Sequence, residues 1–246
     1  MTEQNIQIQT AQGRAEAIIY APGETGLWPG VIHYTDIGGI RASQQEMARR
    51  LAAKGYVVLM PNVFYRTGGL PLFDFPLKFG EERTTKRLAE LSAPLTAEAI
   101  TSDASDYVDF LARQHSVKAG AMGVVGYCFT GKMALYTALA RPDRIAAAAS
   151  FHGGGLATSA PSSPHLILGP SIKARLYFGH AINDRGMPPE AIEKLNLALR
   201  AWGGRYESEV YEGAYHSWTV PDSPVYNPAQ ADRAFEKLTS LFAEAL

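Results

Sequence analysis

The chain has 246 residues, of which 46% are hydrophobic and 19% are charged, and its formal net charge is −1. This composition is typical of a globular protein and excludes a disordered chain or a coiled coil. No basic block is present, so we expect no nucleic-acid partner. No apolar run approaches the roughly 20 residues of a membrane helix, so we expect no membrane partner.

Cysteine usage and the N-terminal residues indicate the compartment. The sequence holds one cysteine, which cannot form an intrachain disulfide and is too few for a cysteine zinc site. Residues 1–10 are polar and lack the basic and apolar regions of a signal peptide. We therefore expect a cytoplasmic protein, a monomer or small homo-oligomer, with no metal or other cofactor.

Segments typical of strands and helices alternate from about residue 30 onward. The first predicted helix begins with a capping box at 43–46 and ends near Gly55. This alternation requires crossover connections, and it predicts an α/β protein whose mostly parallel central sheet has helices on both faces. The predicted strands are 31–34, 57–60, 122–125, 145–150, 174–178 and 207–211, and the later helices lie around 100–111, 129–141, 192–202 and 235–242.

Two segments depart from this alternation. Residues 6–9 alternate with period two and residues 15–21 follow after Gly13, which predicts an antiparallel hairpin at the sheet edge. Residues 65–95 are interrupted by glycine and proline, and a long irregular connection of this kind is typical of a lid or pocket loop. No repeat or linker divides the chain, so we expect one domain over residues 1–246.

The strongest chemical signal is the segment GYCFTG at residues 126–131, between a predicted strand and a predicted helix. A nucleophile at Cys128 would stand on a sharp turn at the carboxyl edge of the sheet. The helix N-terminus favours a thiolate there, and the backbone N–H of Phe129 is placed for an oxyanion hole. The alternative is that Cys128 is an ordinary buried cysteine.

Two further residues favour the catalytic interpretation. Asp184 follows the predicted strand that ends at Phe178, and His216 follows the strand that ends at Tyr211. All three candidates therefore lie at the edge where open α/β sheets place their sites. The order nucleophile, acid, histidine is that of the α/β-hydrolase fold. A lone loop aspartate is usually solvated and a lone histidine usually packed, but this combination predicts a catalytic triad.

Over nearly its whole length, the chain resembles the dienelactone hydrolase family of α/β-hydrolases. The resemblance rests on the cysteine elbow and on residues 51–61, 150–154 and 211–216. It implies a hydrolase that cleaves a small carboxylic ester or lactone through a thioester on Cys128. In this mechanism His216 takes the thiol proton or holds the thiolate, and Asp184 fixes the imidazole tautomer.

The same resemblance assigns two residues after the first parallel strand. The family has an acidic residue near the resting thiol, and Asp36 matches its place, although the family uses glutamate. Asp36 would keep the thiol of Cys128 protonated until substrate displaces it. The N–H of Ile37 would supply the second oxyanion donor.

Two departures from the family pattern concern the pocket. Thr130 stands where the family elbow usually has glycine. Residues 217–220 hold no arginine, whereas dienelactone-cleaving members have one after the histidine that grips a substrate carboxylate. The missing arginine argues against dienelactone itself as the substrate. The residues predicted to line the substrate pocket are Tyr127, Thr130, His152 and Trp218.

Three alternatives remain beside the triad. Residues 126–132 match the glycine and lysine spacing of a P-loop nucleotide binder, but Met133 follows where serine or threonine should hold magnesium. The run His152–Gly155 imitates the oxyanion loop of lipases, but it follows the nucleophile instead of preceding it. A non-catalytic member of the fold would bind a small molecule in the same pocket.

Overall fold

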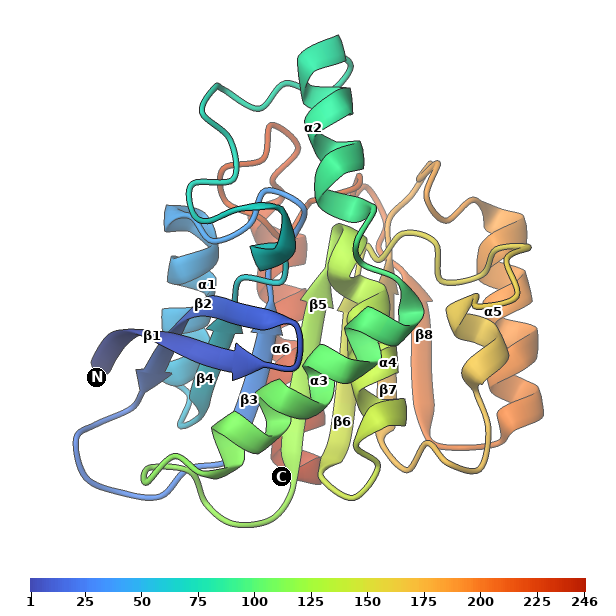
Figure 1. The fold of residues 1–246 in the computed structure, drawn as a ribbon. Helices are drawn as coiled ribbons and strands as arrows, with labels where there is room; N and C mark the ends of the chain where they lie inside the picture. Colours follow the sequence, from blue (N-terminus) through green and yellow to red (C-terminus); the bar gives the residue numbers. More distant parts are fainter.

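The computed structural model describes residues 1–246, and one sheet of eight strands runs through it (Figure 1). The strand order is β1-β2-β4-β3-β5-β6-β7-β8. The strands are β1 (Thr2–Thr10), β2 (Gly13–Ala21), β3 (Gly30–Tyr34), β4 (Val57–Pro61), β5 (Met122–Tyr127), β6 (Ile145–Phe151), β7 (Arg175–His180) and β8 (Tyr206–Val210).

The pairing of these strands is mostly parallel. All neighbouring pairs from β4 to β8 along the sheet run parallel, as the alternation of strands and helices predicts. β1 and β2 form an antiparallel hairpin at the edge, in which Thr10 faces Gly13, and β2 pairs antiparallel with β4. The predicted fold class, the parallel sheet and the edge hairpin are confirmed.

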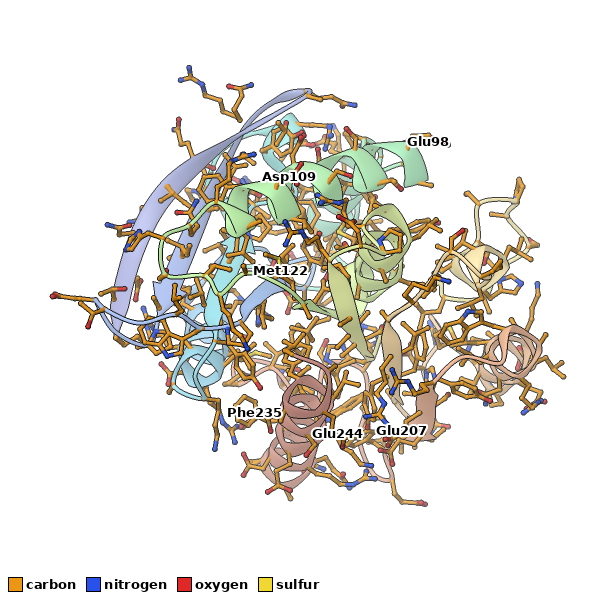
Figure 2. All side chains as sticks on the ribbon, turned by 90° about the horizontal axis from the view of Figure 1, so that it is seen from below. Glu98, Asp109, Met122, Glu207, Phe235 and Glu244 are labelled. Atoms are coloured by element: carbon orange, nitrogen blue, oxygen red, sulfur yellow. The ribbon has the colours of Figure 1, made fainter.

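Helices cover both faces of the sheet. α3, α4 and α5 share one apolar cluster, and α1 and α6 share the other. Viewed from below, Asp109 on α3 and Phe235 on α6 lie on opposite sides of the sheet (Figure 2). None of the helices combines the length and apolar composition needed to cross a bilayer. The helices are α1 (Ala42–Ala52), α2 (Glu82–Ser92), α3 (Ala97–Ala112), α4 (Gly131–Ala140), α5 (Pro189–Trp202) and α6 (Pro228–Ala245), with short 3₁₀ helices η1 (Tyr65–Thr67), η2 (Cys128–Thr130) and η3 (Pro164–Ile167).

β5 shows how the two layers are built. Met122 and Val124 belong to one apolar cluster, and Val125 and Tyr127 belong to the other. Successive side chains of a strand point to opposite faces, so a strand covered on both sides is apolar throughout. Every residue of β5 is buried. The turn that follows β5 is therefore anchored to a fully buried strand.

The ends of α1 differ from the prediction. The N-cap is Arg41, no side chain caps the helix, and the predicted capping box is therefore wrong. Ser43 lies within the first turn, buried and without a hydrogen-bond partner. The helix ends at Ala52, so Gly55 lies in the next turn, where its φ of +93° suits glycine.

The segment 65–95 contains more regular structure than its glycines and prolines indicate. It includes η1 and the helix α2, which extends away from the sheet at the top of Figure 1. Only Thr84 and Leu91 of α2 are buried, so this helix lacks the apolar stripe by which helices are predicted. A buried ion pair of 2.7 Å between Arg66 and Asp103 fixes the start of the segment to α3.

Candidate active site

Cys128 occupies the turn between β5 and α4, where its backbone is left-handed with a φ of 55°. Its N–H donates to His152 Nδ1 at 3.1 Å, and its carbonyl accepts from the Gly154 N–H at 3.2 Å. His152, Asn183 and Ser217 also have positive φ, and they follow β6, β7 and β8 at the same edge of the sheet. Such backbone conformations are rare outside glycine and cluster at functional sites.

Close packing around the turn explains its flanking residues. A Cβ at Gly126 would lie 2.3 Å from the carbonyl oxygen of Thr130, and a Cβ at Gly131 would lie 2.4 Å from Ser150 Oγ. Thr130 is fully buried. Its hydroxyl accepts from the Tyr127 N–H at 3.1 Å and donates to the Thr35 carbonyl at 2.7 Å. The threonine that replaces the family glycine thus ties the turn to the end of β3.

Cys128, His216 and Asp184 come from three separate loops and meet at the carboxyl edge of the sheet. His216 Nε2 lies 3.0 Å from Cys128 Sγ, and His216 Nδ1 lies 2.6 Å from Asp184 Oδ2. The other oxygen of Asp184 accepts the Gly186 N–H at 2.7 Å. Asp184 is buried, whereas about a third of the His216 side chain is exposed. The imidazole therefore bridges a buried carboxylate and the thiol.

The charges of this group follow from its contacts. Burial alone would lower the pKa of His216, but its bonds to Asp184 and Cys128 outweigh burial and raise this pKa to about 10. Burial alone would raise the pKa of Asp184, but His216 and the Gly186 N–H lower it below its usual value. At neutral pH the geometry favours an imidazolium beside an ionised Asp184.

Asp36 lies in the loop after β3, where its carboxylate is bound by a cation. Arg41 donates to both oxygens at 2.6 and 2.8 Å, the Gly38 N–H donates at 2.8 Å, and Gln44 donates at 3.2 Å. The carboxylate makes no hydrogen bond to Cys128 Sγ, although both residues line one cavity. Asp36 and Cys128 thus share one cavity, but no hydrogen bond joins the carboxylate to the thiol.

A cavity of about 690 Å³ contains Cys128. Its walls come from three parts of the chain, which are the loop after β3 with the start of α1, the segment 71–79, and the loop after His216. Its volume lies within the usual range for a small-molecule site. Ile37, the predicted second oxyanion residue, also lines it, and Phe129 follows Cys128 in η2.

The expected pocket lining needs correction. Tyr127, Thr130, His152 and Trp218 do not line the cavity that contains Cys128. Tyr127 faces a separate cavity of about 250 Å³ whose lining residues lie largely on α1 and α6. The other three are buried beneath the site, where Thr130 bonds to β3 and Trp218 packs on His152 at 5.0 Å between ring centroids. For Tyr127 the reason is the pleating of β5. Successive side chains point to opposite faces of a sheet, and Tyr127 packs in the apolar cluster that contains α1 and α6.

The dienelactone hydrolase family model matches residues 15–246. The chain belongs to this family. As a member of this family it is a hydrolase of esters or lactones. Carboxymethylenebutenolidase of Rhodococcus opacus is 27% identical over 233 residues, which cover 93% of this chain and 86% of that protein. A presumed carboxymethylenebutenolidase of a Synechocystis species is 27% identical over 231 residues, covering 92% and 89%.

Solved structures of dienelactone hydrolases share the fold. The structure of a presumed dienelactone hydrolase from Klebsiella pneumoniae superposes with a TM-score of 0.86 at 22% identity, and the match covers 98% of both chains. A dienelactone hydrolase-like promiscuous phosphotriesterase from metagenomic libraries gives a TM-score of 0.79 at 19% identity, covering 99% of this chain and 98% of that one. At these identities the likeness concerns the fold.

The structure of residues 126–132 conflicts with the P-loop alternative. The Lys132 ammonium lies 4.2 Å from the centre of the Phe129 ring. Gly126 and Gly131, which would have to leave room for phosphates, are closed by Thr130 and by Ser150. No group of three or more His, Cys, Asp or Glu side chains is arranged to hold a metal ion.

His152 supports the turn of Cys128 from below. Its Nδ1 accepts the Cys128 N–H, so the ring proton is on Nε2, which donates to Thr219 Oγ1 at 2.7 Å. Burial, together with the nearby charge of His216, holds the pKa of His152 well below its usual value. A neutral imidazole with a fixed tautomer is therefore built into the turn that carries Cys128.

Replacing His152 with alanine should lower kcat by about 10- to 100-fold, because the side chain that accepts the Cys128 N–H is lost and a displacement of about 1 Å at a reactive group can cost about 100-fold. The loss should be far smaller than for the same change at His216, because the contact between the thiol of Cys128 and the imidazole of His216 remains. Steady-state hydrolysis of a chromogenic ester measures both. Losses of reversed rank would contradict the assignment of His216 as the base. Thr219→Val, which removes the partner of His152 Nε2, is the matched control and should cost less than His152→Ala.

Asp36→Asn should make Cys128 react faster with iodoacetamide at a given pH. The substitution removes a negative charge from the cavity and leaves the Arg41 cation, and both changes favour a thiolate. A pH series of alkylation rates compares the variant with the parent. Asp232→Asn, an exposed aspartate paired with Arg50, is the control. Superimposable profiles of Asp36→Asn and the parent would remove Asp36 from any role at the thiol.

Two polar residues of the cavity escape prediction from the sequence. Arg41 and Asp222 both line the cavity and bind each other at 2.7 and 3.0 Å. They are 181 positions apart. Neither belongs to a motif, so no local pattern could have paired them. The apolar wall formed by Leu72, Leu77 and Phe79 lies in the segment 65–95, for which the sequence indicates a lid or pocket loop without showing which of its residues line the cavity.

Proposed function

We propose that this family member cleaves a small carboxylic ester or lactone by acyl transfer to Cys128, through a Cys128–His216–Asp184 triad. The observation that carries the proposal is the continuous contact of thiol, imidazole and carboxylate at 3.0 and 2.6 Å, with the thiol in a cavity of about 690 Å³. A nucleophile, its base and the group that orients the base are the elements of covalent hydrolysis.

Acylation begins from the thiolate of Cys128 paired with the imidazolium of His216. Sγ bonds to the carbonyl carbon, and the carbonyl oxygen becomes an oxyanion held by the N–H groups of Phe129 and Ile37. When the tetrahedral intermediate collapses, the bond to the leaving oxygen breaks. That oxygen takes the proton from His216 Nε2, and the thioester remains on Cys128.

Deacylation uses the same residues in reverse. The now neutral His216 takes a proton from water, whose oxygen attacks the thioester carbonyl. The carbon–sulfur bond breaks, the acid leaves, and Cys128 returns to the thiolate beside the imidazolium. Asp184 holds Nδ1 throughout, so Nε2 stays directed at the sulfur and the reacting oxygen.

A burst experiment tests this proposal. Mixing the protein with excess 4-nitrophenyl acetate should release about one equivalent of nitrophenol per protein before the steady state. Acid quenching during the burst should leave one acetyl group on the peptide that contains Cys128, detected by mass spectrometry. The Cys128→Ala protein should give neither signal. Turnover without an acetylated Cys128 would contradict the thioester, and no turnover at all would favour a non-catalytic binding protein.

A further inference from the structure

The polar groups of the cavity are already paired with one another. Arg41 has five guanidinium N–H groups, and each has an acceptor. Nε donates to Asp222 at 2.7 Å, Nη1 donates to Asp36 at 2.6 Å and to the Gly39 carbonyl at 3.3 Å, and Nη2 donates to Asp36 at 2.8 Å and to Asp222 at 3.0 Å. Arg41, the less exposed of the two cations that line this cavity, therefore has no free donor for a substrate.

The other lysine or arginine that lines the cavity is Lys78, which is more exposed than Arg41. The Lys78 ammonium is 3.5 Å from Glu81, and two-thirds of its side chain is exposed. Two carboxylates, Asp36 and Asp222, face the same cavity. A carboxylate that a substrate carries past Lys78 would thus lose its hydration without gaining a donor from Arg41, and it would lie near two like charges.

The remaining wall is apolar and comes from the segment between η1 and α2. Leu72, Phe73, Leu77 and Phe79 line the cavity, with Val220 from the loop after His216. Phe79 is 71% exposed. A large exposed aromatic side chain on a cavity wall is typical of a surface that a ligand covers.

We propose that the substrate is an uncharged ester whose acyl or alcohol part carries an extended apolar group, which lies along the wall formed by Leu72, Leu77 and Phe79. This inference rests on the proposed function and narrows its substrate. Saturation of Arg41 by Asp36 and Asp222 excludes esters that carry a carboxylate. Asp222 therefore acts in specificity, because it occupies the donors that a substrate carboxylate would need.

The test compares three esters of one leaving group: 4-nitrophenyl acetate, 4-nitrophenyl hexanoate and mono-4-nitrophenyl adipate. Hexanoate and adipate have acyl chains of equal length and differ by a terminal carboxylate. Each buried methylene is worth about fourfold, so kcat/KM for hexanoate should exceed that for acetate by at least about tenfold. The value for adipate should be at least about tenfold below that for hexanoate, because an unpaired charge is costly to bury.

Two variants connect the preference to the named residues. Phe79→Ser should lower the ratio of kcat/KM for hexanoate to that for acetate about three- to tenfold. Leu197→Ser, an exposed leucine on α5 away from the cavity, should leave this ratio unchanged. Asp222→Ala frees two donors of Arg41, so the adipate-to-hexanoate ratio should rise by about tenfold. The ratio is the readout, since a disturbed fold would lower both rates.

The outcomes separate this inference from the proposed function. If none of the three esters is hydrolysed, the proposed function fails. If adipate is cleaved at least as fast as hexanoate, the function stands and the inference is overturned. In that case Lys78→Gln shows whether this lysine binds the acid. An unchanged ratio in Asp222→Ala would equally overturn the role of saturated Arg41 in excluding carboxylates.

Discussion

Replacing Cys128 with alanine should lower kcat for ester hydrolysis by about five orders of magnitude, to the background rate of the buffer. In triad enzymes the loss of the nucleophile alone removes nearly all covalent catalysis. The sulfur is the reacting atom of the proposed mechanism, and no second nucleophile contacts His216 Nε2 in this structure. The decrease should appear in kcat/KM as well, because the thioester cannot form.

Alkylation gives an independent measurement of the same effect. Cys128 is the single cysteine and is partly exposed, so iodoacetamide should modify it in the folded protein. Activity should fall in proportion to the modified fraction, and the Cys128→Ala protein should take up no label. Full activity after complete alkylation would end the cysteine-nucleophile hypothesis.

His216→Ala should lower kcat by about three orders of magnitude or more, because the only group that contacts both Sγ and a buried carboxylate is lost. Without the imidazolium, the thiolate loses its paired cation and the leaving alcohol loses its proton donor. Steady-state kinetics measure the loss, with His152→Ala as the matched histidine control. A loss at position 216 below tenfold would contradict the proposed role.

The raised pKa of His216 gives this prediction a pH dependence. Below about pH 10 the imidazole is protonated and can donate to the leaving oxygen. The burst rate of acylation should therefore hold across the neutral range and fall as the pH rises through about 10. The hydrogen bond to Asp184 raises this pKa, so Asp184→Asn should move the alkaline limb to lower pH. Stopped-flow burst rates at a series of pH values measure the limb. Identical limbs would show that Asp184 does not set the charge of His216.

The positions of Cys128, Asp184 and His216 could be predicted because each depends on local sequence. Apolar runs identify the parallel strands, and the residues that follow them must share one edge of the sheet. Glycines flank the turn at Cys128 because a larger side chain at Gly126 or Gly131 would clash with its neighbours. These features require no knowledge of distant contacts.

The cavity could not be predicted in the same way. Its polar wall depends on Arg41 and Asp222, which meet only after the whole sheet has formed. Its apolar wall lies on a segment whose helix α2 buries just two side chains, so no periodic pattern marks it. The first turn of α1 shows the same limit of local patterns. Ser43 and Glu46 match a capping box, but the N-cap residue is Arg41, whose side chain binds Asp36 and Asp222.

The four non-glycine residues with left-handed backbones have a consequence for the stability of the molecule. Cys128, His152, Asn183 and Ser217 each carry a conformational cost of about 1–3 kcal/mol. The free energy of unfolding of a typical folded protein is only about 5–15 kcal/mol in total. The strain at the carboxyl edge of the sheet is therefore offset by the packing of the two apolar layers that cover the sheet. A cavity-forming substitution under β5 or β6 weakens this packing. It should cause local unfolding of the carboxyl edge before the sheet itself unfolds. In this chain, the stability of the active-site geometry and the stability of the whole fold are therefore separate quantities.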